Sequence, residues 1–161
     1  MIKIIGTIVL LLVVATFAFG FTIYDGMGMV LNSYSNYPVP AINVGVQTNT
    51  TITAGVNLYA LYPDVVQSLN QLPIRNEWII IGNVGLQQDN FALLADFGYS
   101  TYPPVQDING AYIAGLTTIY KFAAGSVLQP SISFSMLWPF TMQNVYYPTM
   151  ILSFENFINL F

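Results

Sequence analysis

The residues of this chain that could perform chemistry are few, and most of them are acidic. The Asp-Phe-Gly sequence at residues 96–98 matches the magnesium-binding tripeptide of protein kinases, but no H-R-D or V-A-I-K sequence accompanies it. Asp107, Asn109 and Gly110 resemble part of a calcium-binding loop, yet the glutamate that should follow the glycine is absent. We therefore expect a turn at each of these places rather than a metal site.

Paired carboxylates are a second chemical possibility, because two acids at a suitable distance can cleave glycosidic bonds. Glu77, Asp89, Asp96 and Asp107 are the candidates, and nothing in their spacing brings two of them together. The chain has no His and no Cys, which excludes a Ser-His-Asp triad, a thiolate nucleophile, disulfides and the usual zinc ligands. We predict no enzyme activity, no cofactor and no metal site.

The composition restricts the class of protein further. The 161 residues include 3 Lys+Arg and 7 Asp+Glu, and charged residues make up 6% of the chain, against about 25% in soluble domains. So few basic residues, with a net charge of -4, exclude nucleic-acid binding by counterion release. A hydrophobic content of 55% excludes intrinsic disorder. A membrane protein, a virion protein or a packed extracellular assembly remains.

An uncharged apolar run, residues 4–24, separates Lys3 from Asp25. As a helix it would be roughly 31 Å long, about the thickness of a hydrocarbon core. Lys3 predicts that the N-terminus stays inside the cell and the rest of the chain lies outside. Three interpretations remain open: a secretory signal peptide cleaved near Ala18 or Gly20, an uncleaved membrane anchor, or a helix that becomes the core of a filament.

Small residues in this run would allow close contact between helices. We assign to the assembly surface of the helix Ile5, Val9, Leu12, Thr16, Ala18, Gly20 and Thr22. Gly26 and Gly28 lower helix stability and predict a bend in a helix that continues to about Leu31.

Beyond a proline-containing stretch at residues 33–41, the dominant period of the sequence becomes two. Residues 42–47, 51–60 and 131–136 alternate strictly between apolar and polar or small side chains. Such alternation predicts strands with an apolar face in a core and a face of Asn, Gln, Ser, Thr and Tyr in solvent. We expect further strands at 77–86, 91–97, 111–122 and 145–154, and turns that include Asp89-Asn90 and Gln129-Pro130.

About seven strands in this part of the chain predict an immunoglobulin-like β-sandwich. The predicted fold class is α+β, with a long apolar N-terminal helix at residues 1–32, a linker at 33–41 and an all-β sandwich domain at 42–161. The scarcity of Lys on the predicted solvent faces suits a protein packed among copies of itself. Asn49 begins the sequence Asn-Thr-Thr, so we predict glycosylation of Asn49 if the chain is exported.

The order of helix, linker and β domain resembles that of archaeal type IV pilins and archaeal-flagellin-like filament subunits. The resemblance implies a structural subunit of an extracellular helical filament, a homo-oligomer of many copies that serves surface adhesion. It also implies that the N-terminal helix is inserted in the membrane before assembly and forms the filament core afterwards. The predicted location is therefore extracellular or at the cell surface.

Two other interpretations fit the same observations. One is a membrane-anchored surface or virion structural protein with an exposed β-sandwich. The other is a secreted β-sandwich filament subunit whose copies are joined by donor-strand exchange. A surface receptor would remain unidentified in either case.

Overall fold

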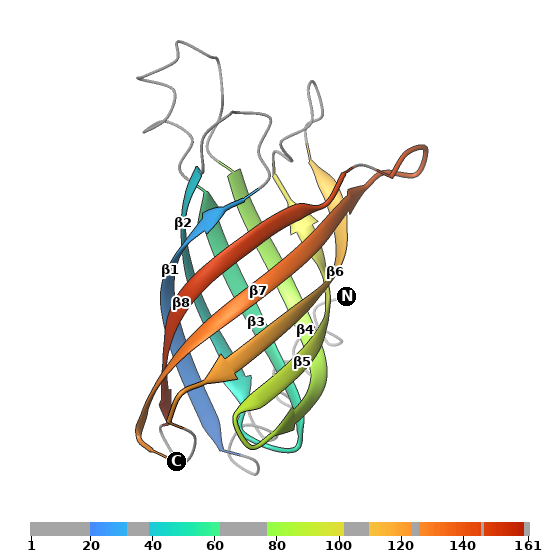
Figure 1. Cartoon of the computed structure of the whole chain (residues 1–161). Coiled ribbons are helices and arrows are strands. Elements are labelled where there is room, and N and C mark those ends of the chain that lie inside the picture. The colour runs from blue at the N-terminus through green and yellow to red at the C-terminus, as the bar shows by residue number, and fades with distance from the viewer. Residues whose placement is uncertain are drawn as a thin grey trace, which may run out of the picture.

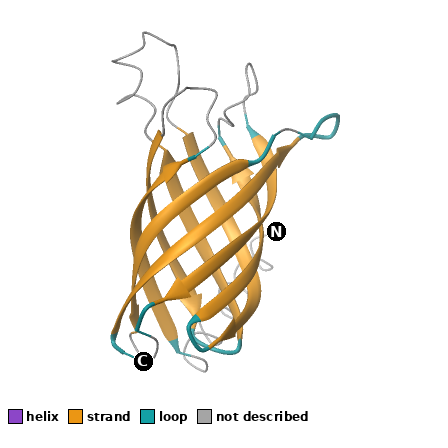
Figure 2. Cartoon of the chain, in the orientation of Figure 1, coloured by secondary structure: helices purple, strands orange, loops and turns teal. Residues whose placement is uncertain are grey.

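The computed structural model describes residues 20–31, 39–61, 77–101, 110–123, 126–145 and 147–159. These residues form a closed barrel of eight antiparallel strands, and no helix occurs among them (Figure 1, Figure 2). The strands are β1 (Phe21–Val30), β2 (Val39–Thr48), β3 (Ile52–Leu61), β4 (Glu77–Gln88), β5 (Phe91–Ser100), β6 (Ala111–Lys121), β7 (Leu128–Phe140) and β8 (Thr149–Asn159). Each strand pairs with its neighbours in sequence, and β1 pairs with β8 to close the barrel.

The alternating sequence explains why these segments are strands. Except at the end of β3, where Tyr59, Ala60 and Leu61 are all buried, burial alternates along the strands with the period of two that side chains follow in a β-strand. The strands are 10 to 13 residues long and wind around the barrel at a clear tilt, as Figure 1 shows. Tilted strands of about this length are what a membrane-spanning barrel requires.

The two ends of the barrel differ in the length of their connections. Residues 31–38, 62–76, 101–110 and 141–148 join strands at one end, and the shorter segments 49–51, 89–90 and 122–127 join them at the other. The predicted turn at Asp89-Asn90 is confirmed, and Asp89 adopts the positive φ of 48° that Asp tolerates in tight turns. The turn predicted at Gln129-Pro130 is wrong, because both residues lie within β7.

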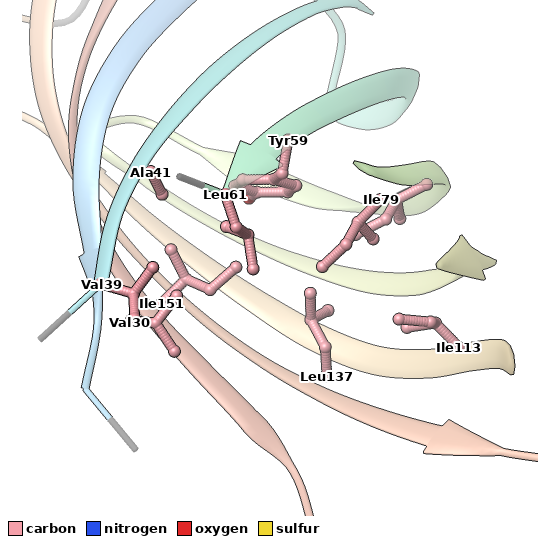
Figure 3. Close-up of a cluster of buried hydrophobic side chains, with 10 residues drawn as sticks. Val30, Val39, Ala41, Tyr59, Leu61, Ile79, Ile113, Leu137 and Ile151 are labelled. Carbon is pink, nitrogen blue, oxygen red and sulfur yellow. The ribbon is translucent and has the colours of Figure 1, made fainter. Parts of the chain in front are cut away.

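A cluster of apolar side chains fills the barrel near the end with the long connections (Figure 3). Its members come from seven strands, and each lies in the half of its strand next to those connections. The cluster consists of Val30, Val39, Ala41, Tyr59, Leu61, Ile79, Ile81, Ile113, Leu137 and Ile151. The side chains of this cluster fill their part of the lumen, as they do in other small barrels.

A second, smaller cluster lies toward the short turns and contains Tyr24, Ala92, Leu94, Ile119 and Phe157. The Tyr24 and Phe157 rings stack with their centroids 4.6 Å apart. The Tyr24 ring lies against Gly45 of the neighbouring strand, where a Cβ would collide with the ring. Glycine at this inward position is what makes room for the tyrosine.

The predicted fold class is wrong. The chain forms an all-β closed barrel and not an α+β protein with an immunoglobulin-like sandwich. Residues 21–30, which we assigned to the end of the N-terminal helix, form β1, and residues 1–19 lie outside the described residues. The predicted linker, 33–41, ends inside β2, and β1 and β2 pair directly across it.

The predicted helix bend at Gly26 and Gly28 is also wrong, because both glycines lie within β1. They serve instead to make room inside the barrel. A Cβ on Gly26 would lie 2.5 Å from Asn43 Oδ1 and 2.7 Å from Glu155 Cγ. Glycine is required at this position because the Asn43 and Glu155 side chains occupy the space that a Cβ would need.

Candidate functional site: an apolar outer surface around a polar lumen

The outer surface of the barrel consists mainly of apolar side chains. On β2, Ile42, Val44 and Val46 point outward and are exposed, whereas Asn43 and Gln47 are buried inside. Both sets lie on strand faces that we predicted the other way round, with the aliphatic residues in a core. A lipid-facing surface with a polar interior is the pattern of membrane barrels.

The same reversal holds on β7. Ser131, Ser133 and Ser135 are buried in the lumen, while the residues between them face outward and are partly exposed. The polar faces that we expected in solvent therefore line the barrel interior. Alternation predicted the strands correctly, but it assigned the two faces to the wrong environments.

Aromatic side chains gather on the outer surface near both ends of the strands. Tyr112 lies 6.0 Å from Tyr99 and 5.8 Å from Phe140 between ring centroids, next to the long connections. Tyr120 and Phe122 meet edge to face at 5.4 Å beside the short turns. Aromatic residues at both borders of an apolar band are typical of barrels at membrane–water interfaces.

Two polar residues interrupt the outer surface at the β1–β8 seam. Asp25 and Asn156 are register partners on adjacent strands, and both are exposed on the outside. Their neighbours on the same face, Ile23 and Met27, are apolar. An acidic side chain in the middle of a lipid-facing strand is unfavourable, although less so than a basic one.

Near the end with the short turns, a chain of hydrogen bonds links side chains of four strands and one turn. Lys121 Nζ donates to Gln87 Oε1 at 2.9 Å, and Gln87 Nε2 donates to Asn49 Oδ1 at 3.3 Å. Asn49 Nδ2 donates to Asn159 Oδ1 at 3.4 Å, and Thr22 Oγ1 donates to the same oxygen at 2.7 Å. We call these five residues the polar ring, which links strands β1, β4, β6 and β8 with the turn before β3.

Glu155 lies at mid-height in the lumen and is buried. Its Oε1 accepts hydrogen bonds from Asn43 Nδ2 at 2.6 Å and from Ser133 Oγ at 2.7 Å. Such charge-assisted hydrogen bonds are stronger than those between neutral groups. They join β8 to β2 and β7 across the interior of the barrel.

Asp96 is the second buried carboxylate and begins a separate chain of hydrogen bonds. Thr117 Oγ1 donates to Asp96 Oδ2 at 2.6 Å and lies 2.8 Å from Ser135 Oγ. Ser135 Oγ in turn lies 3.1 Å from the Tyr59 hydroxyl. This chain ends at the apolar cluster, to which Tyr59 belongs.

A small cavity of about 10 Å³ lies between the two carboxylates. Polar side chains make up much of its wall, and the remainder is apolar. The wall consists of Tyr24, Asn57, Tyr59, Ile81, Asn83, Leu94, Asp96, Thr117, Ile119 and Glu155. Among the described residues, Asn57 Oδ1, Asn83 Oδ1 and Glu155 Oε2 are buried oxygens with no hydrogen-bond partner.

The structure does not bring the described residues among the predicted site residues together in one site. Asp96–Gly98 lies within β5, so the expected turn at these residues is wrong, and the Asp96 carboxylate points into the lumen. Thr22 belongs to the polar ring, and Gly20 precedes β1 with a φ of 73°. The other residues of the predicted assembly surface, together with Asp107 and Asn109, lie outside the described residues.

Asn49 lies in the turn between β2 and β3 and is partly exposed. Its side chain is held between Gln87 and Asn159 in the polar ring. Glycosylation of Asn49 stays a prediction, as do the expected absences of enzyme activity, a cofactor, a metal and a nucleic-acid partner. In the part of the chain that the structure describes, no three His, Cys, Asp or Glu side chains gather where they could hold a metal ion.

Sequence reasoning missed the residues that organise the lumen, above all Glu155, Asn43 and Gln87. A signal for Glu155 was present, because it is an acidic residue within the strongly apolar sequence 150–161. A lone charge in such a strand indicates a buried partner when the other strand faces contain amides and hydroxyls.

The fold and the two faces define a closed eight-stranded barrel with an apolar exterior and an interior filled by both apolar and polar side chains. Among solved structures, the chain is similar to the outer membrane protein Ail of Yersinia pestis, whose backbone structure was obtained in a phospholipid bilayer nanodisc. The similarity has a TM-score of 0.53 at 7% identity, and it covers 86% of this chain and 99% of Ail. No protein-family model and no curated protein matches the sequence.

This similarity of fold overturns the resemblance to pilins and archaeal-flagellin-like subunits. The predicted filament, the homo-oligomer of many copies and the helix as assembly element are wrong, because residues 21–30 are a strand of a barrel. Donor-strand exchange is wrong for the same fold, since a closed barrel presents no free sheet edge. The predicted membrane-anchored surface protein comes closer, although its domain is a barrel and not a sandwich.

The described residues contain no helix long and apolar enough to cross a membrane. Residues 21–30 of the predicted membrane helix form β1, and residues 1–19 lie outside the described residues. The predicted cell-surface location is compatible with the likeness to an outer-membrane protein.

Proposed function

We propose that this chain is a membrane-spanning β-barrel of an outer membrane, which anchors surface loops and does not conduct solutes. The observation that carries the proposal is the distribution of side chains on the strands: apolar residues face outward, and the interior holds many polar and charged side chains between two apolar clusters. A water-soluble barrel needs the opposite arrangement. The fold of Ail supports the same conclusion.

The lumen supports an anchoring role over a channel. The apolar cluster fills one end of the interior, and the polar ring closes the other. Eight-stranded barrels have an interior just wide enough for side chains. We expect the barrel to be impermeable to ions and metabolites.

The orientation follows from the connections. In bacterial outer-membrane barrels the short turns face the periplasm and the longer loops face outward. Residues 31–38, 62–76, 101–110 and 141–148 would therefore face the exterior. In the last of these connections Met142, Val145 and Tyr147 are strongly exposed, so a contact with another surface would involve this segment.

Export to an outer membrane requires a secretory signal, and residues 1–20 have the matching sequence pattern. Lys3 is followed by an uncharged apolar run, and the barrel begins at Phe21. We propose cleavage near Gly20, the first of the three interpretations given above. N-terminal sequencing of the membrane-embedded protein should give a start near Phe21, and a start at Met1 would contradict this assignment.

Tryptophan fluorescence tests the proposed membrane location. Trp78 and Trp138 occupy outward positions on β4 and β7, each in the half of its strand next to the long connections. In phosphatidylcholine vesicles, lipids brominated near the headgroup should quench both tryptophans more strongly than lipids brominated near the bilayer centre. Trp78→Phe and Trp138→Phe report the two sites separately. Unquenched fluorescence in vesicles, or a stable monomer in detergent-free buffer, would contradict the proposal.

Planar-bilayer recording tests the closed lumen. Purified barrel should produce no stepwise conductance at physiological salt. The double variant Leu137→Ala and Ile113→Ala removes two side chains of the apolar cluster and provides the comparison. Regular conductance steps from the unaltered protein would show that it is a channel.

A further inference from the structure

The cavity between Asp96 and Glu155 has the properties of a binding site for a small cation. Three of the residues that line it, Asn57, Asn83 and Glu155, each carry one buried oxygen without a hydrogen-bond partner among the described residues. All three side chains are more than nine-tenths buried. Leaving such acceptors unpaired costs the free energy of their desolvation, so a ligand that satisfies them is favoured.

The chemistry of the wall selects the kind of ligand. Carboxylate and amide oxygens are the donors that hard cations prefer. One water can donate only two hydrogen bonds, which is fewer than the three unpaired oxygens. A hard cation takes several oxygen ligands at once, so its coordination is not limited to two of these side chains.

The size and charge of the site restrict the ion further. A cavity of about 10 Å³ accommodates one particle of the size of a water molecule. The buried charged side chains of the described lumen are Asp96, Glu155 and Lys121, so two carboxylates face one ammonium. The Lys121 ammonium donates to Gln87 in the polar ring and lies 4.6 Å from the centre of the Phe157 ring. A single positive charge would balance the lumen, whereas a divalent ion would exceed the balance.

From this geometry we propose that the barrel binds one sodium ion in the cavity lined by Glu155, Asp96, Asn57 and Asn83. The ion replaces the missing hydrogen-bond donors and neutralises the remaining buried negative charge. It joins β3, β4, β5 and β8 at mid-height, between the two apolar clusters. The inference rests on the lumen and does not depend on the proposed membrane location.

Thermal unfolding in detergent micelles tests the site with sodium as the probe. The barrel is refolded at equal ionic strength in sodium chloride, potassium chloride or choline chloride. We expect the unfolding temperature to be several degrees higher in sodium than in choline, and to rise with sodium concentration until it saturates. The shift in the larger potassium ion should be smaller.

Two variants make the test specific. Glu155→Gln removes one carboxylate charge at the cavity and should abolish the sodium-dependent shift. Asp25→Asn removes one carboxylate charge on the outer surface and should leave the shift unchanged. If Glu155→Gln does not fold, Asn57→Leu removes a proposed ligand without altering charge and should reduce the shift at least twofold.

Three results would overturn the proposal. Equal unfolding temperatures in sodium and choline would show that water or a proton satisfies these oxygens. A shift that persists in Glu155→Gln would place any sodium effect elsewhere. A saturable response to millimolar calcium without a response to sodium would show a divalent site instead.

Discussion

The two faces of the same strands are adapted to different surroundings. On β7 the inward residues include Ser133 and Ser135, which bond to partners on β8 and β6. Phe134 and Met136, which directly follow these serines in the sequence, face away from the lumen. Inward side chains therefore depend on particular partners, whereas outward side chains need only an apolar environment. Substitutions at neighbouring positions can measure this difference.

The largest difference is expected from truncation at Leu137 and Met136. Leu137→Ala leaves a cavity inside the apolar cluster and should lower the free energy of unfolding by about 2–5 kcal/mol. Met136→Ala opens a space that lipid chains can fill, so its loss should be well below that of Leu137→Ala. Urea unfolding in vesicles, followed by tryptophan fluorescence, measures both. Equal losses would show that the outward face is packed against protein.

A positive charge on the outer surface should have the next largest effect. Val44→Arg places a guanidinium in the middle of β2 and should cost about 2–4 kcal/mol in a bilayer. Ile52 is the first residue of β3 and lies beside a short turn, so the cost of Ile52→Arg should fall to about 0–1 kcal/mol. Urea titration of both variants in vesicles tests this dependence on depth. Similar costs at the two positions would contradict a membrane-embedded exterior.

Removal of a single hydroxyl inside the barrel should have a moderate effect. Thr117→Val deletes the donor to Asp96 and the contact with Ser135, and we expect a loss of about 1–3 kcal/mol. Thr118→Val is the matched control, because Thr118 is outward and its hydroxyl makes only a 3.4 Å contact with the Phe134 carbonyl. This control should be neutral or slightly stabilising. A neutral Thr117→Val would show that the Asp96 chain does not contribute to stability.

The smallest effect should come from the acidic residue on the apolar outer surface. Asp25→Leu removes an exposed charge from an apolar face and should stabilise the barrel in vesicles by about 1 kcal/mol. Asp89→Asn changes the same charge in a turn, at a positive φ that Asn also tolerates, and should have no effect. Equilibrium unfolding of both variants in vesicles makes the comparison. A destabilising Asp25→Leu would indicate that Asp25 has a functional partner.

The sequence predicted most of the strands because alternation depends on local geometry alone. Residues 42–47 and 131–136 alternate as clearly in the sequence as they do in the structure. Alternation does not specify which face meets water, and we assumed that the polar one does. The scarcity of Lys and Glu on those faces was evidence against that assumption, since solvent-facing strands normally carry charge.

The first strand was missed because a long apolar run precedes it. Residues 4–24 suggested one helix, and β1 begins within that run, at Phe21. From Thr22 onward the alternation is weak, because Asp25 interrupts the apolar positions and Gly26 and Gly28 carry no side chain. The resemblance to pilins relied on the order of helix and β domain, so it was wrong once residues 21–30 proved to be a strand.

The polar network in the lumen could not be predicted from local patterns. Asn43 and Glu155 are hydrogen-bonded although 112 positions separate them in the sequence. Their contact depends on the register of β1 with both β2 and β8, which is fixed only when the barrel closes. No spacing rule relates such residues, so the site could be found only from the structure.

The seam between β1 and β8 also determines when this protein can finish folding. A chain made from its N-terminus exposes β1 long before its second partner strand exists, because Thr22 pairs with Asn159, 137 positions later. Until then the edge of β1 and the apolar outer faces are open to pairing with other chains. Such distant pairing is intrinsically slow, so these surfaces stay exposed until the last strand is made. Arrival of β8 completes the sheet and removes both hazards at once.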